Sequence, residues 1–260
     1  MQLASKIPMK SLASSVHSSR WDRYRSPQGL YPVIGRMLPW LAGSALLFCG
    51  LAIAVGFTAP LNEFPQGTAF KIVFLHAPAE WMARFVYLLM AAWAMVALLH
   101  GGRLPSMMVR ALAPTGAIFA LMALWSGSLW GRVAWGTWWD ARLTAELTLA
   151  LLYVGAISVH VATEKSSLSD WVVAVPASGV VGILVLSLVK PGPWYILHLK
   201  TLQGAIEGAP VSGATLVGIA GMFLGFWLYA SAMALLRLRC IILEGERDSE
   251  WVAPFLETGR

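Results

Sequence analysis

The sequence predicts an all-α polytopic membrane protein, a bundle of six transmembrane helices. Of the 260 residues, 58% are hydrophobic and only 12% are charged, whereas about a quarter of the residues in a soluble domain carry a charge. Six separate stretches are apolar over a membrane-spanning length, and none alternates with period two for long enough to suggest a barrel. Together these observations make a water-soluble enzyme a poor interpretation of the chain.

Each predicted span contains the roughly 20 mostly apolar residues that cross about 30 Å of hydrocarbon. No internal repeat of fixed period occurs, and no linker is long enough to separate two domains. The bundle is therefore one membrane domain, residues 37–236. Its six spans are Met37–Thr58, Ile72–Leu99, Ala111–Trp130, Thr144–Ala162, Trp171–Val189 and Gly213–Leu236.

The distribution of basic residues predicts the orientation of this bundle. With six spans both termini lie on one side, and thirteen of the 19 lysines and arginines lie on that side. Because cytoplasmic segments are enriched in Lys and Arg, we expect cytoplasmic tails at residues 1–36 and 237–260. The first tail is Ser-rich and basic without an apolar core, so it is no secretory signal. An organellar transit peptide is the alternative interpretation of it.

This orientation places three loops, about 59–71, 131–143 and 190–212, on the outer face, whereas about 100–110 and 163–170 form short inner connectors. The net charge of +6 comes from basic residues at segment ends and forms no patch for nucleic acid. Two cysteines, Cys49 and Cys240, provide neither a disulfide framework nor a Cys-rich metal site.

Tryptophan is concentrated in the second outer loop. Five of the 13 tryptophans lie between Trp125 and Trp139. An interfacial belt at the lipid headgroups explains Trp125 and Trp130. It explains Trp135, Trp138 and Trp139 less well, because they share a short loop with glycines, Asp140 and Arg142. Indole faces stack on conjugated rings and arginine binds carboxylates, so the loop predicts a site for a flat, apolar ligand with charged edges.

Two of the five histidines flank this loop on the outer face. His76 lies about 35 Å along a helix from the inner boundary at Leu99, and His198 follows the fifth span by a few residues. His100 and His160 fall at inner helix ends, where polar residues are expected. Two neutral imidazoles beside a tryptophan platform are suited to bind an iron from opposite faces. We expect Pro78 to start the second span, with His76 on its outer, non-helical side.

Glu80 and Arg84 lie one helical turn apart just inside the second span. Charges at that depth are costly and normally pair or face the interior. A structural ion pair that fixes the helix is the simpler interpretation. The alternative is that Arg84 or Lys200 meets a carboxylate of the ligand.

The motifs resemble those of a known family. Residues 127–131 read GSLWG, residues 135–144 read WGTWWDARLT, and residues 76–82 at the start of the second span read HAPAEWM. This pattern resembles the tryptophan-rich WWD signature of haem-handling proteins, and with the short six-span chain it resembles the haem exporter protein C (CcmC) family of bacterial cytochrome c maturation. The resemblance covers nearly the whole chain beyond the first 35 residues.

The resemblance implies non-covalent haem b as a transferred ligand, bound at the periplasmic face of the bacterial inner membrane. It implies His76 and His198 as axial ligands of the iron. It implies a platform made of Trp130, Trp135, Trp138, Trp139 and Asp140, with Arg142 beside it. The implied partners are a periplasmic haem chaperone, the membrane and ATPase subunits of an ABC transporter, and a small single-span accessory protein. A C-x-x-C-H motif is absent, so the chain itself attaches no covalent haem.

The chain departs from the family signature at two points. Asp140 follows Trp139 directly, where the signature has two further residues, and residues 194–198 read WYILH, one residue shorter than the usual setting of the second histidine. Glu80 and Arg84 stand where uncharged residues are expected, so no family role is carried onto them.

Two other classes of function compete with haem delivery. An electron carrier would hold one bis-histidine haem between His76 and His198 and another between His100 and His160, but these histidines lie in a loop or at helix ends. A channel or transporter acting alone would need an energy source, and the chain has neither a Walker A sequence nor a series of intramembrane carboxylates. No hydrolytic or redox motif indicates an enzyme.

Overall fold

The computed structural model of the chain describes residues 26–58, 67–163, 171–174 and 213–253. Within these ranges the protein contains no strand and is a bundle of long helices, α2 (Pro27–Thr58), α3 (Val73–His100), α4 (Arg103–Trp135), α5 (Ala141–Thr163) and α8 (Gly213–Gly245), with a short 3-10 helix, η1 (Gly67–Ile72), directly before α3. All five helices are long and apolar enough to cross a membrane. The prediction of an all-helical membrane protein is confirmed to this extent.

Two of the helix boundaries have clear local causes. α2 begins where Ser26 accepts a hydrogen bond from the backbone N–H of Gly29 at 3.2 Å, with Pro27 as the first helical residue, a usual Ser N-cap followed by Pro. α3 and α4 are joined by Gly101 and Gly102 alone, at φ +68° and +104°. Only glycine adopts such angles readily, so the predicted inner connector 100–110 shortens to two residues.

Several helices extend beyond their predicted apolar spans. α2 starts within the predicted tail 1–36, and α8 continues nine residues into the predicted tail 237–260. The reason is that hydropathy marks only the part of a helix that fits the hydrocarbon, whereas the backbone continues to the next capping residue.

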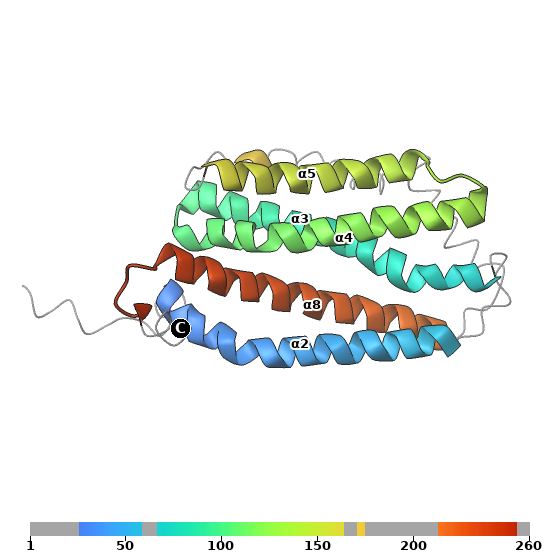
Figure 1. The fold of residues 1–260 in the computed structure, drawn as a ribbon, viewed down its shortest axis with the longest axis horizontal. Coiled ribbons are helices and arrows are strands. Elements are labelled where there is room, and N and C mark those ends of the chain that lie inside the picture. The colour runs from blue at the N-terminus through green and yellow to red at the C-terminus, as the bar shows by residue number, and fades with distance from the viewer. Residues whose placement is uncertain (1–25, 59–66, 164–170, 175–212, 254–260) are drawn as a thin grey trace, which may run out of the picture.

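α4 is the central helix of the bundle. In the most apolar 18-residue stretch of α4, 56% of the residues are buried, against 11% in that of α2. α4 packs against α3, α5 and α8, while α2 packs mainly against α8 (Figure 1). The main core lies between these helices and includes the edge-to-face pair of Tyr87 and Tyr153, whose ring centroids are 5.2 Å apart.

The end of the bundle at which residues 136–140 join α4 to α5 is called the tryptophan end here, and it lies on the right of Figure 1. α2 starts and α8 ends at the opposite end. α5 and α8 run in the same direction, and the predicted span Trp171–Val189 lies between them in sequence. Apart from residues 171–174, this span, the fifth of the six predicted, falls outside the described residues. The total of six spans and the side on which the termini lie therefore stay predictions.

Candidate functional site

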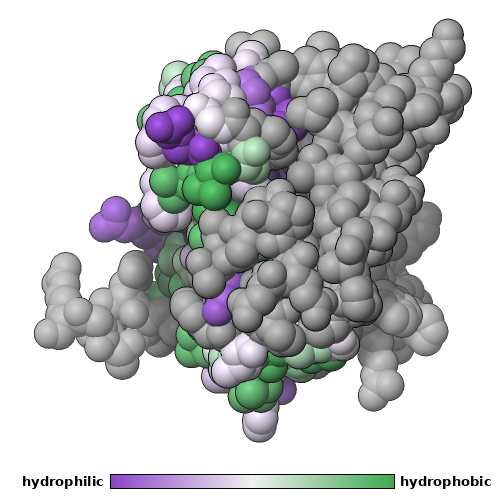
Figure 2. Space-filling view, turned by 90° about the vertical axis from the view of Figure 1, so that its right-hand side faces the viewer, coloured by the Kyte–Doolittle hydropathy of each residue, from purple (hydrophilic) through white to green (hydrophobic). Residues whose placement is uncertain are grey.

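The tryptophan end carries the candidate site. Figure 2 looks onto this end and shows hydrophilic and hydrophobic residues side by side where its surface is described. A small pocket here is lined by residues of three helices, His76, Gly127, Trp130, Arg142, Leu143 and Glu146. Its empty space is about 250 Å³, a volume that includes open solvent.

His76 lies in the first turn of α3 and is buried, with 4% of its surface exposed. This corrects the expectation that Pro78 starts the helix with His76 outside it. Pro78 is the sixth residue of α3, because η1 leads into the helix without a break and α3 already begins at Val73. Pro78 thus lies inside the helix, at a position where proline has no N–H to donate to the carbonyl one turn earlier.

One turn of α4 surrounds the imidazole of His76. Its Nδ1 lies 3.1 Å from Oγ of Ser126, and the indole of Trp130 contacts the ring edge-to-face at 5.6 Å between centroids. Gly127 lies between these two residues, and a Cβ atom placed on it would come within 2.9 Å of Cε1 of His76. The imidazole therefore packs directly against the backbone of α4.

Trp130 is a core residue of this site and not a member of an interfacial belt. Only 9% of its surface is exposed, and it packs on Phe70 of η1 as well as on His76. Trp125 is 60% exposed, as the belt interpretation predicts for a lipid-facing indole. The belt explanation is thus wrong for Trp130, because η1 folds over the face of α4 on which Trp130 lies.

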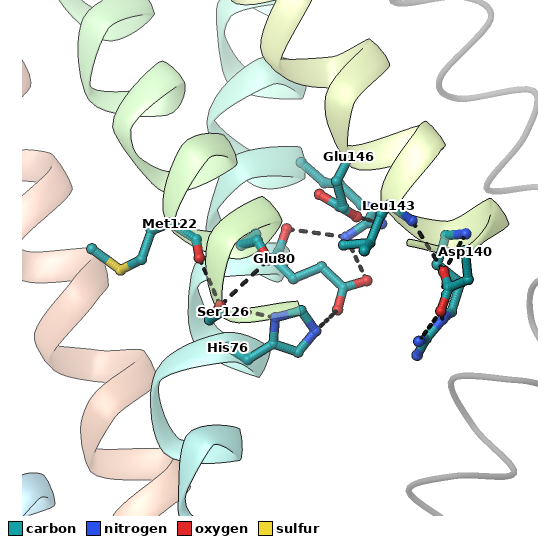
Figure 3. A network of polar contacts seen from close by, with 10 residues as sticks. His76, Glu80, Met122, Ser126, Asp140, Leu143 and Glu146 are labelled. Atoms are coloured by element: carbon teal, nitrogen blue, oxygen red, sulfur yellow. Dashed lines mark hydrogen bonds and ion pairs between the residues drawn. The ribbon is translucent and has the colours of Figure 1, made fainter. Parts of the chain in front are cut away.

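A chain of buried charges connects His76 to α5 (Figure 3). Nε2 of His76 lies 3.5 Å from Oε2 of Glu80, and the other oxygen of Glu80 is 2.8 Å from Nη1 of Arg84. Arg84 also forms an ion pair with Glu146 of α5. The ion pair of Glu80 and Arg84 is therefore present, as predicted, and one guanidinium joins two carboxylates from different helices.

Sequence reasoning missed Glu146, Ser126 and Gly127. Glu146 could have been found, because a carboxylate two residues inside a predicted span is itself a sign of an interior partner. Ser126 gives no such sign, since small residues are common on packed faces of membrane helices, and Gly127 is noted only as the first residue of the GSLWG motif.

The tryptophan loop is shorter than predicted. α4 continues to Trp135 and ends where Gly136 adopts φ +76° and its N–H bonds to the carbonyl of Arg132, a left-handed glycine cap. The connection between the helices is therefore Gly136–Asp140 and not 131–143. Trp135 is the last residue of α4, and its side chain lies outside what the structure describes.

The loop presents two indoles to the surface. Trp138 and Trp139 are 56% and 49% exposed. Oγ of Ser128 donates to the carbonyl of Trp138 at 2.7 Å, and Nε1 of Trp139 donates to Oγ1 of Thr144 at 3.2 Å. Arg132 lies over the ring of Trp138 at 5.9 Å. The contacts hold the loop in place, and about half of the surface of each indole remains exposed.

Asp140 caps α5 and holds Arg142. Its Oδ1 accepts the backbone N–H of Arg142 at 2.8 Å and that of Leu143 at 3.3 Å, as an N-cap aspartate does. Both carboxylate oxygens also pair with the Arg142 guanidinium. Burial alone would raise the pKa of Asp140, but hydrogen bonds and the charge of Arg142 outweigh it and hold this pKa below its ordinary value. Asp140 thus holds the guanidinium of Arg142 beside the pocket.

Of the predicted site residues, the structure brings His76, Trp130 and Arg142 together at one pocket and places Asp140, Trp138 and Trp139 in the adjoining loop. His198 and Lys200 lie outside the described residues. The axial pairing of His76 with His198 therefore stays a prediction. His160 is buried and His100 is exposed, both near the opposite end of the bundle.

Fold and site together define a polytopic helical membrane protein with a polar, aromatic site at one end. A family model described as Heme exporter protein C matches residues 20–253. The chain is 34% identical to Heme exporter protein C of Escherichia coli K12 over 247 residues, 90% of this chain and 96% of that protein. The proteins of the same name from Haemophilus influenzae and Bradyrhizobium diazoefficiens are 31% and 32% identical, over 90% and 84% of this chain and 96% and 83% of theirs. The chain belongs to the Heme exporter protein C family.

Proposed function

We propose that this protein binds haem at the tryptophan end and transfers it to an acceptor during cytochrome c maturation, without catalysing a reaction itself. The observation that carries the proposal is the position of His76, an imidazole fixed by Ser126 and Trp130 in the wall of a pocket that also contains Arg142. The names of the relatives, which describe exporters of heme, agree with haem as the cargo.

The side chains of the site match the chemistry of a haem. A neutral imidazole ligates iron, and a guanidinium such as that of Arg142 donates hydrogen bonds to carboxylates, which include haem propionates. Trp130 closes one side of the pocket, and the exposed indoles of Trp138 and Trp139 offer faces on which a conjugated ring can stack. Trp135 is proposed as part of the same platform. Arg142 lines the pocket and Arg84 does not, which favours Arg142 over Arg84 as the propionate partner.

Reversible axial ligation accounts for transfer. Haem b is held non-covalently by His76 and, as we propose, by His198. It leaves the site when a side chain of the acceptor replaces one of the two imidazoles. The acceptor is a periplasmic haem chaperone. The membrane and ATPase subunits of an ABC transporter and a small single-span protein complete the complex in the bacterial inner membrane, with the haem site on the periplasmic side.

The visible absorption spectrum of the purified protein tests this proposal. Protein from haem-replete membranes is measured oxidised and reduced, beside single alanine variants of His76, His198 and His160. We expect a low-spin bis-histidine spectrum that is lost or shifted in the first two variants and retained in His160→Ala. A His76→Ala, His198→Ala double variant with full haem content and an unchanged spectrum would contradict the proposal. Haem that depends on His100 and His160 would favour the electron-carrier alternative.

A further inference from the structure

We infer that Ser126 and Gly127 of α4 are positioning residues for His76, which select the imidazole tautomer and orientation that present Nε2 to the iron. This inference rests on the proposed function for its purpose, but its main observation, the tautomer, belongs to the haem-free protein.

The hydrogen-bond donor of the pair follows from the environment of Ser126. Its hydroxyl has a single proton and lies 2.6 Å from the carbonyl oxygen of Met122, against 3.3 Å from that of Ala123 and 3.1 Å from Nδ1 of His76. The proton is therefore donated to Met122, as in the i−4 bonds that Ser makes in membrane helices. The remaining lone pairs of Oγ can only accept, so Nδ1 of His76 carries a proton and donates it to Ser126.

The protonated Nδ1 determines the character of the other nitrogen. In a neutral imidazole one nitrogen is a donor and the other has the lone pair, so Nε2 is the nitrogen able to ligate a metal. The contact of Nε2 with Glu80 is 3.5 Å, longer than an ordinary hydrogen bond of 2.7–3.2 Å. Of these two contacts, the one between Nδ1 and Ser126 has the length of a hydrogen bond. Metal-ligating histidines commonly have their other nitrogen fixed in this way.

Gly127 determines how closely the ring approaches α4. A Cβ on residue 127 would lie 2.9 Å from Cε1 of His76 and 3.0 Å from Cδ2 of Leu143. Both distances are shorter than van der Waals contact, so any side chain here displaces the imidazole or α5. With Trp130 against the ring on the next turn, α4 restricts His76 to one orientation.

The tautomer is measured in haem-free protein that carries ¹⁵N-labelled histidine, in lipid nanodiscs at pH 8, where an ordinary imidazole is neutral. A His76→Asn sample identifies the signals of His76. We expect His76 of the unsubstituted protein to be protonated at Nδ1, Ser126→Thr to keep this tautomer, and Ser126→Ala to shift the ring toward the Nε2-protonated form. A matched control is Ser231→Ala, because Ser231 donates to the carbonyl of Trp227 at 2.9 Å in the same i−4 manner on α8.

A His76 ring protonated at Nε2 in the unsubstituted protein, or unchanged by Ser126→Ala, would overturn the inference. Haem titration is the second measurement. We expect Ser126→Ala to weaken haem binding by roughly 10–100-fold, as loss of an outer-shell partner does, while Ser126→Thr and Ser231→Ala bind haem normally. Equal haem affinity in the unsubstituted protein and in these three variants overturns the positioning role. If His76→Asn also binds haem normally, the proposed function fails instead, whatever the tautomer.

The steric part has its own pair of variants. Gly127→Ala should alter the low-spin electron paramagnetic resonance signal of the ferric haem and weaken haem binding, because the imidazole must turn or move. Gly155→Ala on α5 is the control, since nothing lies within 4 Å of a Cβ at that position. An unchanged signal and affinity in Gly127→Ala would show that the ring orientation does not depend on α4.

Discussion

The tryptophan end and the contact between α2 and α8 are stabilised in different ways. At the tryptophan end α3 and α5 are connected by Arg84, which pairs with both Glu80 and Glu146. The contact between α2 and α8 depends on small residues. Gly225 of α8 is so close to α2 that a Cβ on it would lie 2.5 Å from Sγ of Cys49, and one on Gly221 would lie 3.3 Å from Cβ of Ala52.

The difference indicates which part of the bundle has a task beyond packing. In lipid, apolar faces gain little by leaving the hydrocarbon, and small residues that allow close approach are sufficient to associate two helices. Buried charges are costly in the same environment and mark functional sites. Among the described residues, the buried carboxylates Glu80 and Glu146 lie at the pocket of His76, whereas Arg239 of α8 lies over the ring of Tyr31 of α2 near the opposite end. The buried carboxylate network therefore belongs to the candidate site.

Removal of the central cation should have the largest effect on stability. Arg84→Leu leaves Glu80 and Glu146 facing each other without a counter-charge, which typically costs about 3–5 kcal/mol for a broken buried pair. Thermal unfolding in detergent should show a strongly lowered Tm. The triple variant Glu80→Gln, Arg84→Met, Glu146→Gln should recover much of the loss, because it has no unpaired charge. A single variant as stable as the unsubstituted protein would mean that the network is well hydrated.

Overpacking of α2 against α8 should have a smaller effect. Gly225→Ala forces a methyl group against Cys49, and such insertions typically cost about 1–3 kcal/mol. We expect a lowered Tm together with unchanged haem content per folded protein, since this contact lies outside the candidate site. Gly43→Ala on α2 is the control, because nothing lies within 4 Å of a Cβ there. Loss of haem in Gly225→Ala at temperatures where it remains folded would mean that the two regions are coupled.

Loss of the helix cap at Asp140 should cost about 1 kcal/mol. Asp140→Ala removes both the cap and the partner of Arg142, whereas Asp140→Asn keeps a capping oxygen and removes the charge. The Asp140→Asn variant should therefore be more stable than Asp140→Ala but bind haem less well than the unsubstituted protein, because Arg142 loses its anchor. Comparison of Tm and haem affinity in the two variants separates the two roles, and equal haem affinity in Asp140→Asn would exclude the anchoring role.

A fall in pH should weaken the interaction of Asp140 with Arg142. The pKa of Asp140 is lower in the folded protein than its ordinary value, so its contribution to stability is complete above the ordinary pKa of about 4 and is lost as the pH falls through the lowered folded pKa. Between neutral pH and about pH 5 the stability difference between the unsubstituted protein and Asp140→Asn should stay constant, and it should shrink only in stronger acid. Unfolding midpoints of both proteins, measured across this pH range, check the direction of the change in stability.

The exposed indole should matter least for stability. Trp138→Ala removes a side chain that is 56% exposed, and the bond from Ser128 ends on the backbone carbonyl, which alanine retains. Substitutions at such positions usually change stability by no more than about 0.5 kcal/mol. Haem affinity should nevertheless fall if Trp138 stacks on the ligand. Trp130→Ala is the contrast, because it opens the core beside His76 and should lower both quantities.

Much of this protein could be predicted from single stretches of sequence. Apolar runs of spanning length predict α2, α3, α4, α5 and α8, because in lipid each run must satisfy its backbone within its own helix. The tryptophan cluster predicts the loop near Asp140, and the spacing of Glu80 and Arg84 predicts their ion pair. Each of these features is local, so neighbouring residues are sufficient to specify it.

Only the tertiary structure decided which residues meet across helices. Glu146 joins Arg84 from 62 positions away, and Ser126 reaches His76 from 50. Hydropathy places these residues in spans but gives neither the rotation of each helix nor its neighbour. Those follow from close packing, in which Gly127 lets α3 approach α4 and η1 covers Trp130. The sequence by itself thus determined the class of protein and the end that carries the site, and helix packing determined the surroundings of His76.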